Sequence, residues 1–159
     1  MNRTGAEHIR QCLTAYLGFS NVRTLNIAGP IERLIDEICR TRHMSEQELV
    51  SRLQHDENLL STFACVATVG ETYFWRNGNQ LEWLAEHLHR WHQQHPAAPP
   101  STIWSAGCSS GEEPYSLAMA LQMRWPEWTK KVRLTACDVD SQAIEKARRA
   151  CYTAWSFRN

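Results

Sequence analysis

The chain has 159 residues and 43% of them are apolar, which is enough for a hydrophobic core in one domain or in two small ones. Lysine and arginine together number 17, as do aspartate and glutamate, and this balance excludes a strong net field for nucleic acid or anionic lipid. We therefore expect partners to be recognised locally, with no nucleic acid among them.

Two features of the sequence concern the cell compartment. No apolar run reaches the roughly 20 residues that a membrane span needs, so we expect no direct membrane insertion. The six cysteines are widely spaced, without a C-x-x-C pair, and no signal peptide precedes them. This pattern favours a reducing, cytoplasmic location, with Cys12, Cys39 and Cys65 acting as small apolar residues of helix cores.

Residues 1–67 have the pattern of a helical subdomain. Apolar residues recur at helical spacing in the stretches 9–17, 31–38 and 59–67. Ser45 and Glu48 form a capping box that predicts the start of another helix. Residues 68–100 follow as a linking motif and one helix over 80–94, which ends at the proline-containing stretch HPAAPP.

The hydrophobic period changes after residue 100. The runs TIWSA and VRLTAC are short and β-prone, and helical stretches follow them at 114–124 and 141–150. This order predicts an α/β fold, in which residues 101–159 form the first part of a Rossmann-like domain with two strands and two helices. Because two parallel strands do not complete such a sheet, we expect a truncated domain whose exposed edge favours self-association.

The turn after the first expected strand has the features of a ligand site. Gly107 and Gly111 flank Cys-Ser-Ser between a strand and a helix, where small residues let a ligand approach free backbone N–H groups. The dinucleotide fingerprint is absent, because Ser105 and Ser110 occupy the places of its other glycines. No Walker A lysine follows the turn, which disfavours a phosphate-binding loop.

Acidic residues near this turn favour a cationic nucleoside. Glu112 and Glu113 would repel a pyrophosphate and suit an ammonium or a sulfonium, although both also complement the dipole of a first helical turn. Asp138 ends the second strand, where a carboxylate can accept hydrogen bonds from ribose hydroxyls. Asp140 is the expected cap of the next helix, with Ser141 as its competitor. The pattern predicts an adenosine-type cofactor.

A group of histidines in the helix over 80–94 invites a metal-site interpretation. His89, His92 and His95 follow one another at i, i+3 spacing, with His87 nearby. No cysteine or paired acid completes a ligand set, so we interpret these histidines as a solvated, polar helix face and expect no metal.

Four motifs of the sequence belong together: ETYFWR at 71–76, IWSAGCSSGEEPYSLAM at 103–119, ACDVD at 136–140 and ARRACYTAWSFRN at 147–159. In combination they resemble the chemotaxis-receptor glutamate methyltransferase family, the CheR-type enzymes. The resemblance implies a Rossmann-like methyltransferase domain, S-adenosylmethionine as cofactor and S-adenosylhomocysteine as product. It also implies methyl transfer to glutamate side chains in the cytoplasmic domain of methyl-accepting chemotaxis-type receptors.

The resemblance also implies roles for individual residues. Thr72 and Arg76 match residues placed against the cofactor, Glu113 matches the acid near its methionine end, and Asp138 matches the acid on its ribose. From its sequence context alone, Arg76 is interpreted as a surface arginine. The resemblance makes Arg76 the candidate catalytic residue, able to hold a carboxylate. The full set of candidate cofactor-binding residues is Gly70, Thr72, Arg76, Ala106, Gly107, Cys108, Glu113, Asp138 and Val139.

The sequence departs from the family pattern at two positions and leaves three functions open. Gly70 stands where members often have asparagine, so one polar contact is in doubt, and Trp75 replaces the more usual phenylalanine. The first function is the N-terminal part of a methyltransferase, which we expect to be inactive alone. The second is a catalytically silent helical module that binds receptor or signalling partners. The third, a nicotinamide-cofactor protein, is disfavoured by the missing fingerprint.

Overall fold

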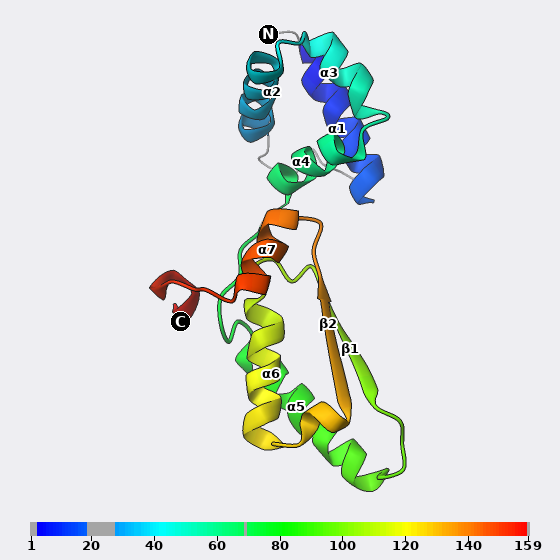
Figure 1. The fold of residues 1–159 in the computed structure, drawn as a ribbon, viewed down its shortest axis with the longest axis vertical. Helices are drawn as coiled ribbons and strands as arrows, with labels where there is room; N and C mark the ends of the chain where they lie inside the picture. The colour runs from blue at the N-terminus through cyan, green and yellow to red at the C-terminus, as the bar shows by residue number, and fades with distance from the viewer. Residues whose placement is uncertain (1–2, 19–27, 69, 159) are drawn as a thin grey trace. The chain divides into compact units, whose positions relative to one another are not determined.

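The computed structural model describes residues 3–18, 28–68 and 70–158. The chain divides into two compact units, Met1–Val69 and Gly70–Asn159. Figure 1 shows that the described part of the first unit is built of helices and that the second unit combines helices with strands. The division of the chain into three parts at residues 67 and 100 stays a prediction.

Four helices form the described part of the first unit. They are α1 (Arg3–Leu17), α2 (Ala28–Arg42), α3 (Glu46–Leu53) and α4 (Glu57–Ala67). Ser45 caps α3 by accepting a hydrogen bond from the amide of Glu48, as the capping box predicts, and Asp56 caps α4 in the same way. The core of this unit joins residues from all four helices, among them Ile9, Ile31, Leu49 and Phe63.

The second unit alternates helices and strands. Its elements are α5 (Gly78–Gln94), β1 (Ser101–Ala106), α6 (Glu112–Arg124), the 3-10 turn η2 (Trp128–Lys130), β2 (Val132–Cys137), α7 (Ser141–Arg149) and the 3-10 turn η3 (Ala154–Phe157). Asp140 caps α7, accepting from the amides of Gln142 and Ala143, so the predicted cap is confirmed over Ser141.

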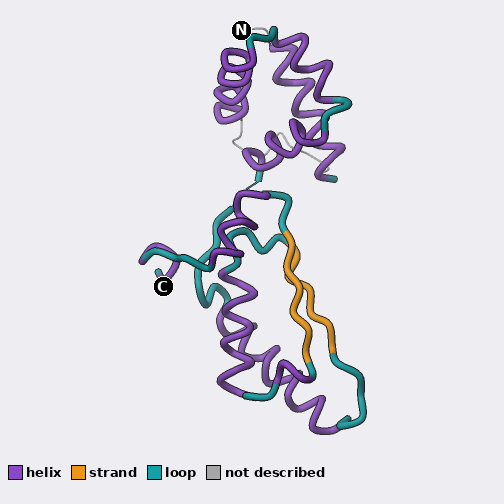
Figure 2. Tube along the Cα trace, in the orientation of Figure 1, coloured by secondary structure: helices purple, strands orange, loops and turns teal. Residues whose placement is uncertain are grey.

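The two strands pair in parallel, with Ser101 opposite Val132 and Ala106 opposite Cys137. Both strands run toward α7 and the N-terminal end of α6, and Figure 2 shows them as the only strands of the described chain. The carboxyl ends of both strands therefore lie at one edge of the sheet, where α/β proteins bind ligands. The predicted fold class, a helical part followed by the start of a parallel α/β domain, is confirmed.

Helices α5 and α6 cover one face of the sheet. Leu88 of α5, Leu121 of α6 and Val132 of β2 are buried in one cluster, and the half-buried Ile103 packs against it. Side chains alternate along a strand, so the next residues point to the other face. On that face Trp104 is 65% exposed, which leaves the sheet uncovered there in the described chain.

His92 corrects the prediction of a solvated histidine face on α5. Its side chain is only 4% exposed, packs against the rings of Trp91 and Trp125, and has its Nε2 3.0 Å from the hydroxyl of Ser101. His87 and His95 are exposed, as predicted. Within the described residues no group of three or more histidines, cysteines and acids is arranged to hold a metal ion.

Burial of His92 makes the stability of the second unit depend on pH. Burial disfavours the imidazolium and lowers the pKa of His92 from its ordinary 6.5, and the positive charges of Lys131 and His95 add to this effect. As the pH falls through 6.5 the unfolded chain takes up this proton first, so the free energy of unfolding decreases until the folded pKa is also passed. We expect the urea midpoint, followed by tryptophan fluorescence, to fall over this range.

The matched variants are His92→Gln, which does not titrate, and His87→Gln on the exposed face of the same helix. We expect the first to flatten the pH dependence near neutrality and the second to leave it as in the parent chain. An unchanged slope in His92→Gln would assign the effect to another group.

Among the helices in the described parts of the chain, none combines the length and the apolar character needed to cross a bilayer.

Candidate functional site

The turn after β1 is joined to the end of β2 by a network of backbone hydrogen bonds. The amides of Gly107 and Cys108 both donate to the carbonyl oxygen of Cys137 at 2.9 Å. The carboxylate of Asp138 accepts from the amide of Ser109 at 2.6 Å through Oδ2, and from the amide of Asp140 at 2.9 Å through Oδ1. The structure thus brings together the small-residue turn and the acid that sequence reasoning placed in one site.

The turn requires left-handed backbone at three positions. Gly107 has a φ of +76° and Gly111 a φ of +94°, and Ser109 between them has a φ of +48°. Glycine adopts these values without steric cost, whereas a residue with a Cβ is strained. Ser109 is held by its amide bond to Asp138 and by its hydroxyl, which donates to the carbonyl oxygen of Gly70 at 3.2 Å. Gly70 therefore contacts the turn through its backbone.

Space and hydrogen-bonding capacity remain at this edge of the sheet. Apart from Gly107 and its two chain neighbours, no atom of the described residues lies within 4 Å of the place where a Cβ on Gly107 would stand, so the backbone is open to an approaching ligand there. A carboxylate offers about four acceptor positions, and the two amides occupy two of those on Asp138. The remaining two suit the vicinal hydroxyls of a ribose, which fits an adenosine-type cofactor.

The two acids at the start of α6 have different surroundings. Glu113 is exposed and accepts a hydrogen bond from the hydroxyl of Ser105 at 2.7 Å, so its carboxylate lies beside β1. Glu112 is buried, with 2% of its surface exposed, and accepts hydrogen bonds from Ser110 and Ser156. The sequence pattern offered one interpretation for both acids and did not identify Glu112 as an internal residue.

The segment 71–76 approaches the site through Gly70. Thr72 is half-buried, and Arg76 is exposed with its guanidinium donating to the carbonyl oxygen of Glu71. The Arg76 guanidinium also lies 6.0 Å from the ring of Tyr73. Among the described residues Arg76 contacts Glu71 and Tyr73 of its own segment, so a role for Arg76 against a cofactor stays a proposal.

The other candidate residues lie on or behind the turn. Ala106 ends β1 and is exposed, as is Val139, while Cys108 is buried with 2% of its surface exposed. Burial and, secondarily, the charge of Asp138 raise the pKa of the Cys108 thiol, so this thiol stays protonated at neutral pH. Cys108 therefore contributes its backbone and volume to the site, whereas nucleophilic chemistry is disfavoured.

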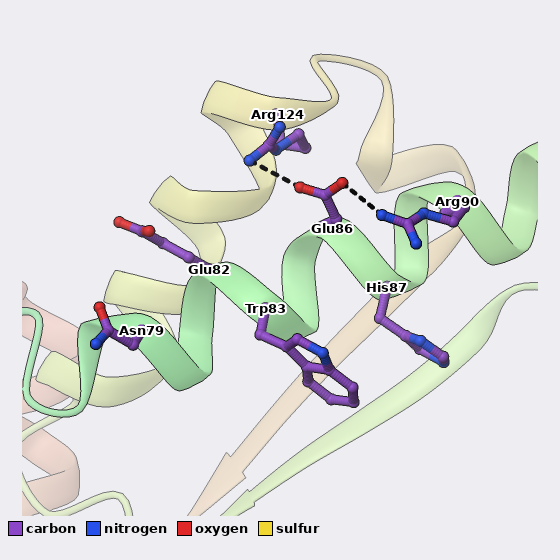
Figure 3. Close-up of a pocket in the computed structure, with 7 residues that line it drawn as sticks. All are labelled: Asn79, Glu82, Trp83, Glu86, His87, Arg90 and Arg124. Carbon is purple, nitrogen blue, oxygen red and sulfur yellow. Dashed lines mark hydrogen bonds and ion pairs between the residues drawn. The ribbon is translucent and has the colours of Figure 1, made fainter.

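Three cavities lie near α6 in the described chain. One of about 380 Å³ is lined mostly by apolar residues of α6, β2 and α7, and touches the turn at Cys108 and Gly111. A second, of about 330 Å³, lies along α5 and the end of α6, where Glu86 pairs with both Arg90 and Arg124 (Figure 3). A third, of about 440 Å³, lies between α5 and α6. None of the three is lined by Glu113 or Asp138.

A small-residue turn, an acid closing the neighbouring parallel strand and helices on one face define the start of a Rossmann-like nucleoside-binding domain. Residues 70–159, more than half of the chain, match the family described as CheR methyltransferase, SAM binding domain. The chain belongs to the CheR methyltransferase family, and S-adenosylmethionine is the cofactor of this domain.

Curated relatives agree with this family. A chemotaxis protein methyltransferase 2 from Vibrio cholerae is 34% identical over 131 residues, which cover 80% of this chain and 46% of the relative. A chemotaxis protein methyltransferase from Salmonella typhimurium is 32% identical over 105 residues, covering 65% and 34%. One from Borreliella burgdorferi is 46% identical over 52 residues, covering 31% and 18%. The chain spans less than half the length of these relatives.

Proposed function

We propose that residues 70–159 hold S-adenosylmethionine at the carboxyl edge of β1 and β2, and that the chain takes part in methylating glutamates of chemoreceptor-type proteins. The observation that carries the proposal is the hydrogen bond from the Ser109 amide to Asp138, which joins the turn to the end of the neighbouring strand. The names of the relatives support the substrate class, since they are chemotaxis methyltransferases.

In this proposal different residues of the site contact different parts of the cofactor. Asp138 keeps acceptor positions for ribose hydroxyls, and the open backbone at Gly107 admits the nucleoside. The exposed carboxylate of Glu113 supplies negative charge beside β1, which attracts an ammonium or a sulfonium. Ala106, Cys108 and Val139 complete the wall of the proposed pocket through their backbones.

The proposed methyl transfer depends more on correct placement of the cofactor and the acceptor glutamate than on a strong base. Bound S-adenosylmethionine would supply a methyl group on a sulfonium, which would pass to a glutamate oxygen as the sulfur–carbon bond breaks, leaving a neutral ester and a thioether. A glutamate with an ordinary pKa of about 4.3 is already an anion at neutral pH, so no proton has to be removed. The chain must align the two groups and exclude water. We assign to Arg76 the holding of a carboxylate, either that of the cofactor or that of the substrate.

Titration calorimetry with S-adenosylhomocysteine tests cofactor binding by this chain, with NADH as the comparison ligand. We expect binding of the first and none of the second. Absence of S-adenosylhomocysteine binding would contradict the proposal and support a catalytically silent helical module. The first unit of the chain, which would form this module, has a core of its own. Tritium transfer from labelled cofactor to receptor peptides would show whether this chain also turns over.

Arg76 variants test the proposed role of the guanidinium. If a planar, two-pronged contact with a carboxylate is needed, Arg76→Lys and Arg76→Ala should both weaken S-adenosylhomocysteine binding. The affinity should fall about tenfold for each loss of about 1.5 kcal/mol in binding free energy. Arg90→Ala is the matched control, because Arg90 is an exposed arginine of the same unit that pairs with Glu86. Full recovery of affinity in Arg76→Lys would show that only the positive charge of Arg76 is needed and that its planar shape is not.

A further inference from the structure

Glu112 is a carboxylate inside the second unit, at the first position of α6. Its Oε1 accepts a hydrogen bond from the hydroxyl of Ser156 at 2.8 Å, and its Oε2 accepts one from the hydroxyl of Ser110 at 2.8 Å. In the described parts of the chain no lysine, arginine or histidine pairs with it. Burial of a carboxylate costs free energy, so we expect the Glu112 side chain to have a role at this place.

Ser156 joins the C-terminal segment both to Glu112, through its hydroxyl, and to the segment that carries Thr72 and Arg76, through its backbone. The amide of Phe74 donates to the carbonyl oxygen of Ser156 at 2.7 Å. The ring of Phe74 stacks on Phe157 and meets Tyr152 edge-on, with ring centroids 4.8 Å apart in both pairs. Glu112 thus holds the hydroxyl of the same serine whose backbone holds Phe74.

Tyr152 strengthens the other arm of this network. Its hydroxyl donates to the carbonyl oxygen of Ser110 at 2.8 Å, so the turn and the C-terminal segment are joined a second time beside Glu112. Burial and the nearby charge of Glu112 raise the pKa of Tyr152 to about 12. The phenol therefore stays protonated and keeps donating at any physiological pH.

The backbone of Glu112 reaches the same segment by a second route. The hydroxyl of Ser116 donates to the carbonyl oxygen of Glu112 at 2.6 Å and accepts from the amide of Trp75 at 2.9 Å. Trp75 has a φ of +61°, and Asn77 a φ of +57°. Left-handed backbone at a bulky residue is strained and persists only where surrounding contacts determine it.

We propose that Glu112 is a positioning residue: its buried carboxylate fixes Ser156 and, through the carbonyl oxygen of Ser156, the backbone of Phe74, and thereby places Thr72 and Arg76 for the cofactor. The effect on the backbone follows from the contacts around Glu112 alone. The effect on the cofactor rests on the function proposed above.

Amide hydrogen exchange of Phe74 and Trp75, followed by nuclear magnetic resonance in the 159-residue chain, tests the effect on the backbone. In Glu112→Ala we expect the Phe74 amide to exchange about tenfold faster or more, as loss of one to two hydrogen bonds implies. The Trp75 amide, which Ser116 and the backbone of Glu112 still hold, and the Leu121 amide in the core should keep their rates. Glu112→Gln should restore the Phe74 rate to within about threefold, because its amide group can accept from one serine and donate to the other. Glu145→Ala, at an exposed acid paired with Arg149, should change neither amide.

Ser156→Ala removes only the hydroxyl that meets Oε1 and gives the same measurement if Glu112→Ala does not fold. We expect its Phe74 amide to exchange about fivefold faster, again with Leu121 unchanged. Unchanged exchange of Phe74 in the folded variants would overturn the proposal, and so would faster exchange throughout the unit with no local excess.

S-adenosylhomocysteine titration of the same variants separates this inference from the proposed function. We expect about a tenfold weaker affinity in Glu112→Ala and recovery in Glu112→Gln. Local exchange effects in a parent chain that binds no S-adenosylhomocysteine would uphold the positioning role and contradict the proposed function. Binding that stays unchanged in Glu112→Ala, despite faster exchange, would overturn the link from Glu112 to the cofactor.

Discussion

Replacing Gly111 by alanine is expected to destabilise the second unit by about 2–5 kcal/mol. The new Cβ would lie 2.8 Å from the Cβ of Ala147 and 3.1 Å from the hydroxyl oxygen of Tyr152, so α7 and the C-terminal segment must shift. Overpacking of this kind costs about 1–3 kcal/mol, and left-handed backbone at an alanine adds about 1–2 kcal/mol. Urea unfolding followed by tryptophan fluorescence measures the effect, because all seven tryptophans lie between residues 75 and 155.

Gly107→Ala is the matched control for this prediction. Gly107 also has a left-handed φ, of +76°, but a Cβ there would meet no atom within 4 Å. We expect a loss of only about 1–2 kcal/mol, from backbone strain alone. Equal losses in the two variants would mean that the contact of Gly111 with α7 and Tyr152 contributes nothing.

Asp138→Ala is expected to weaken S-adenosylhomocysteine binding by about 1–3 kcal/mol, which corresponds to roughly five- to 150-fold in affinity. The variant removes the proposed acceptor for the ribose hydroxyls and leaves the amides of Ser109 and Asp140 without their carboxylate partner. Because the turn itself loosens, we also expect a loss of unfolding free energy of about 1–3 kcal/mol. Calorimetry and urea unfolding on the same sample give the two quantities.

Asp140→Ala separates the ribose contact from simple loosening of this region. Asp140 is two residues away and caps α7 through the amides of Gln142 and Ala143, so its loss should cost about 1 kcal/mol of stability. We expect its affinity for S-adenosylhomocysteine to stay close to that of the parent chain. A similar loss of affinity in both variants would remove Asp138 from the proposed pocket.

Local pattern was sufficient to predict the elements that build the site. The two β-prone runs and the helical stretches behind them lie within a few residues of the observed strands and helices. Since the carboxyl ends of parallel strands meet at one edge, the contact of Asp138 with the turn followed from the order of the elements. Which cofactor atoms each candidate residue contacts stays a prediction.

Burial set by distant segments could not be predicted in the same way. Glu112 and Glu113 are adjacent and point about 100° apart on α6. Contacts from distant segments, such as that of Ser156 with Glu112, enclose one acid and leave the other exposed. His92 was misassigned for the same reason, because Trp125 and Ser101 enclose it from other elements. Periodicity describes one helix at a time and carries no information on such neighbours.

The bare face of the sheet has a consequence for assembly. A strand added along either edge would satisfy free backbone groups, and any element laid over Trp104 would remove a large indole from water. Both gains favour the same arrangement, in which further strands pair with the edges and another element packs over the exposed face. These elements can come from the same polypeptide or from a neighbouring molecule.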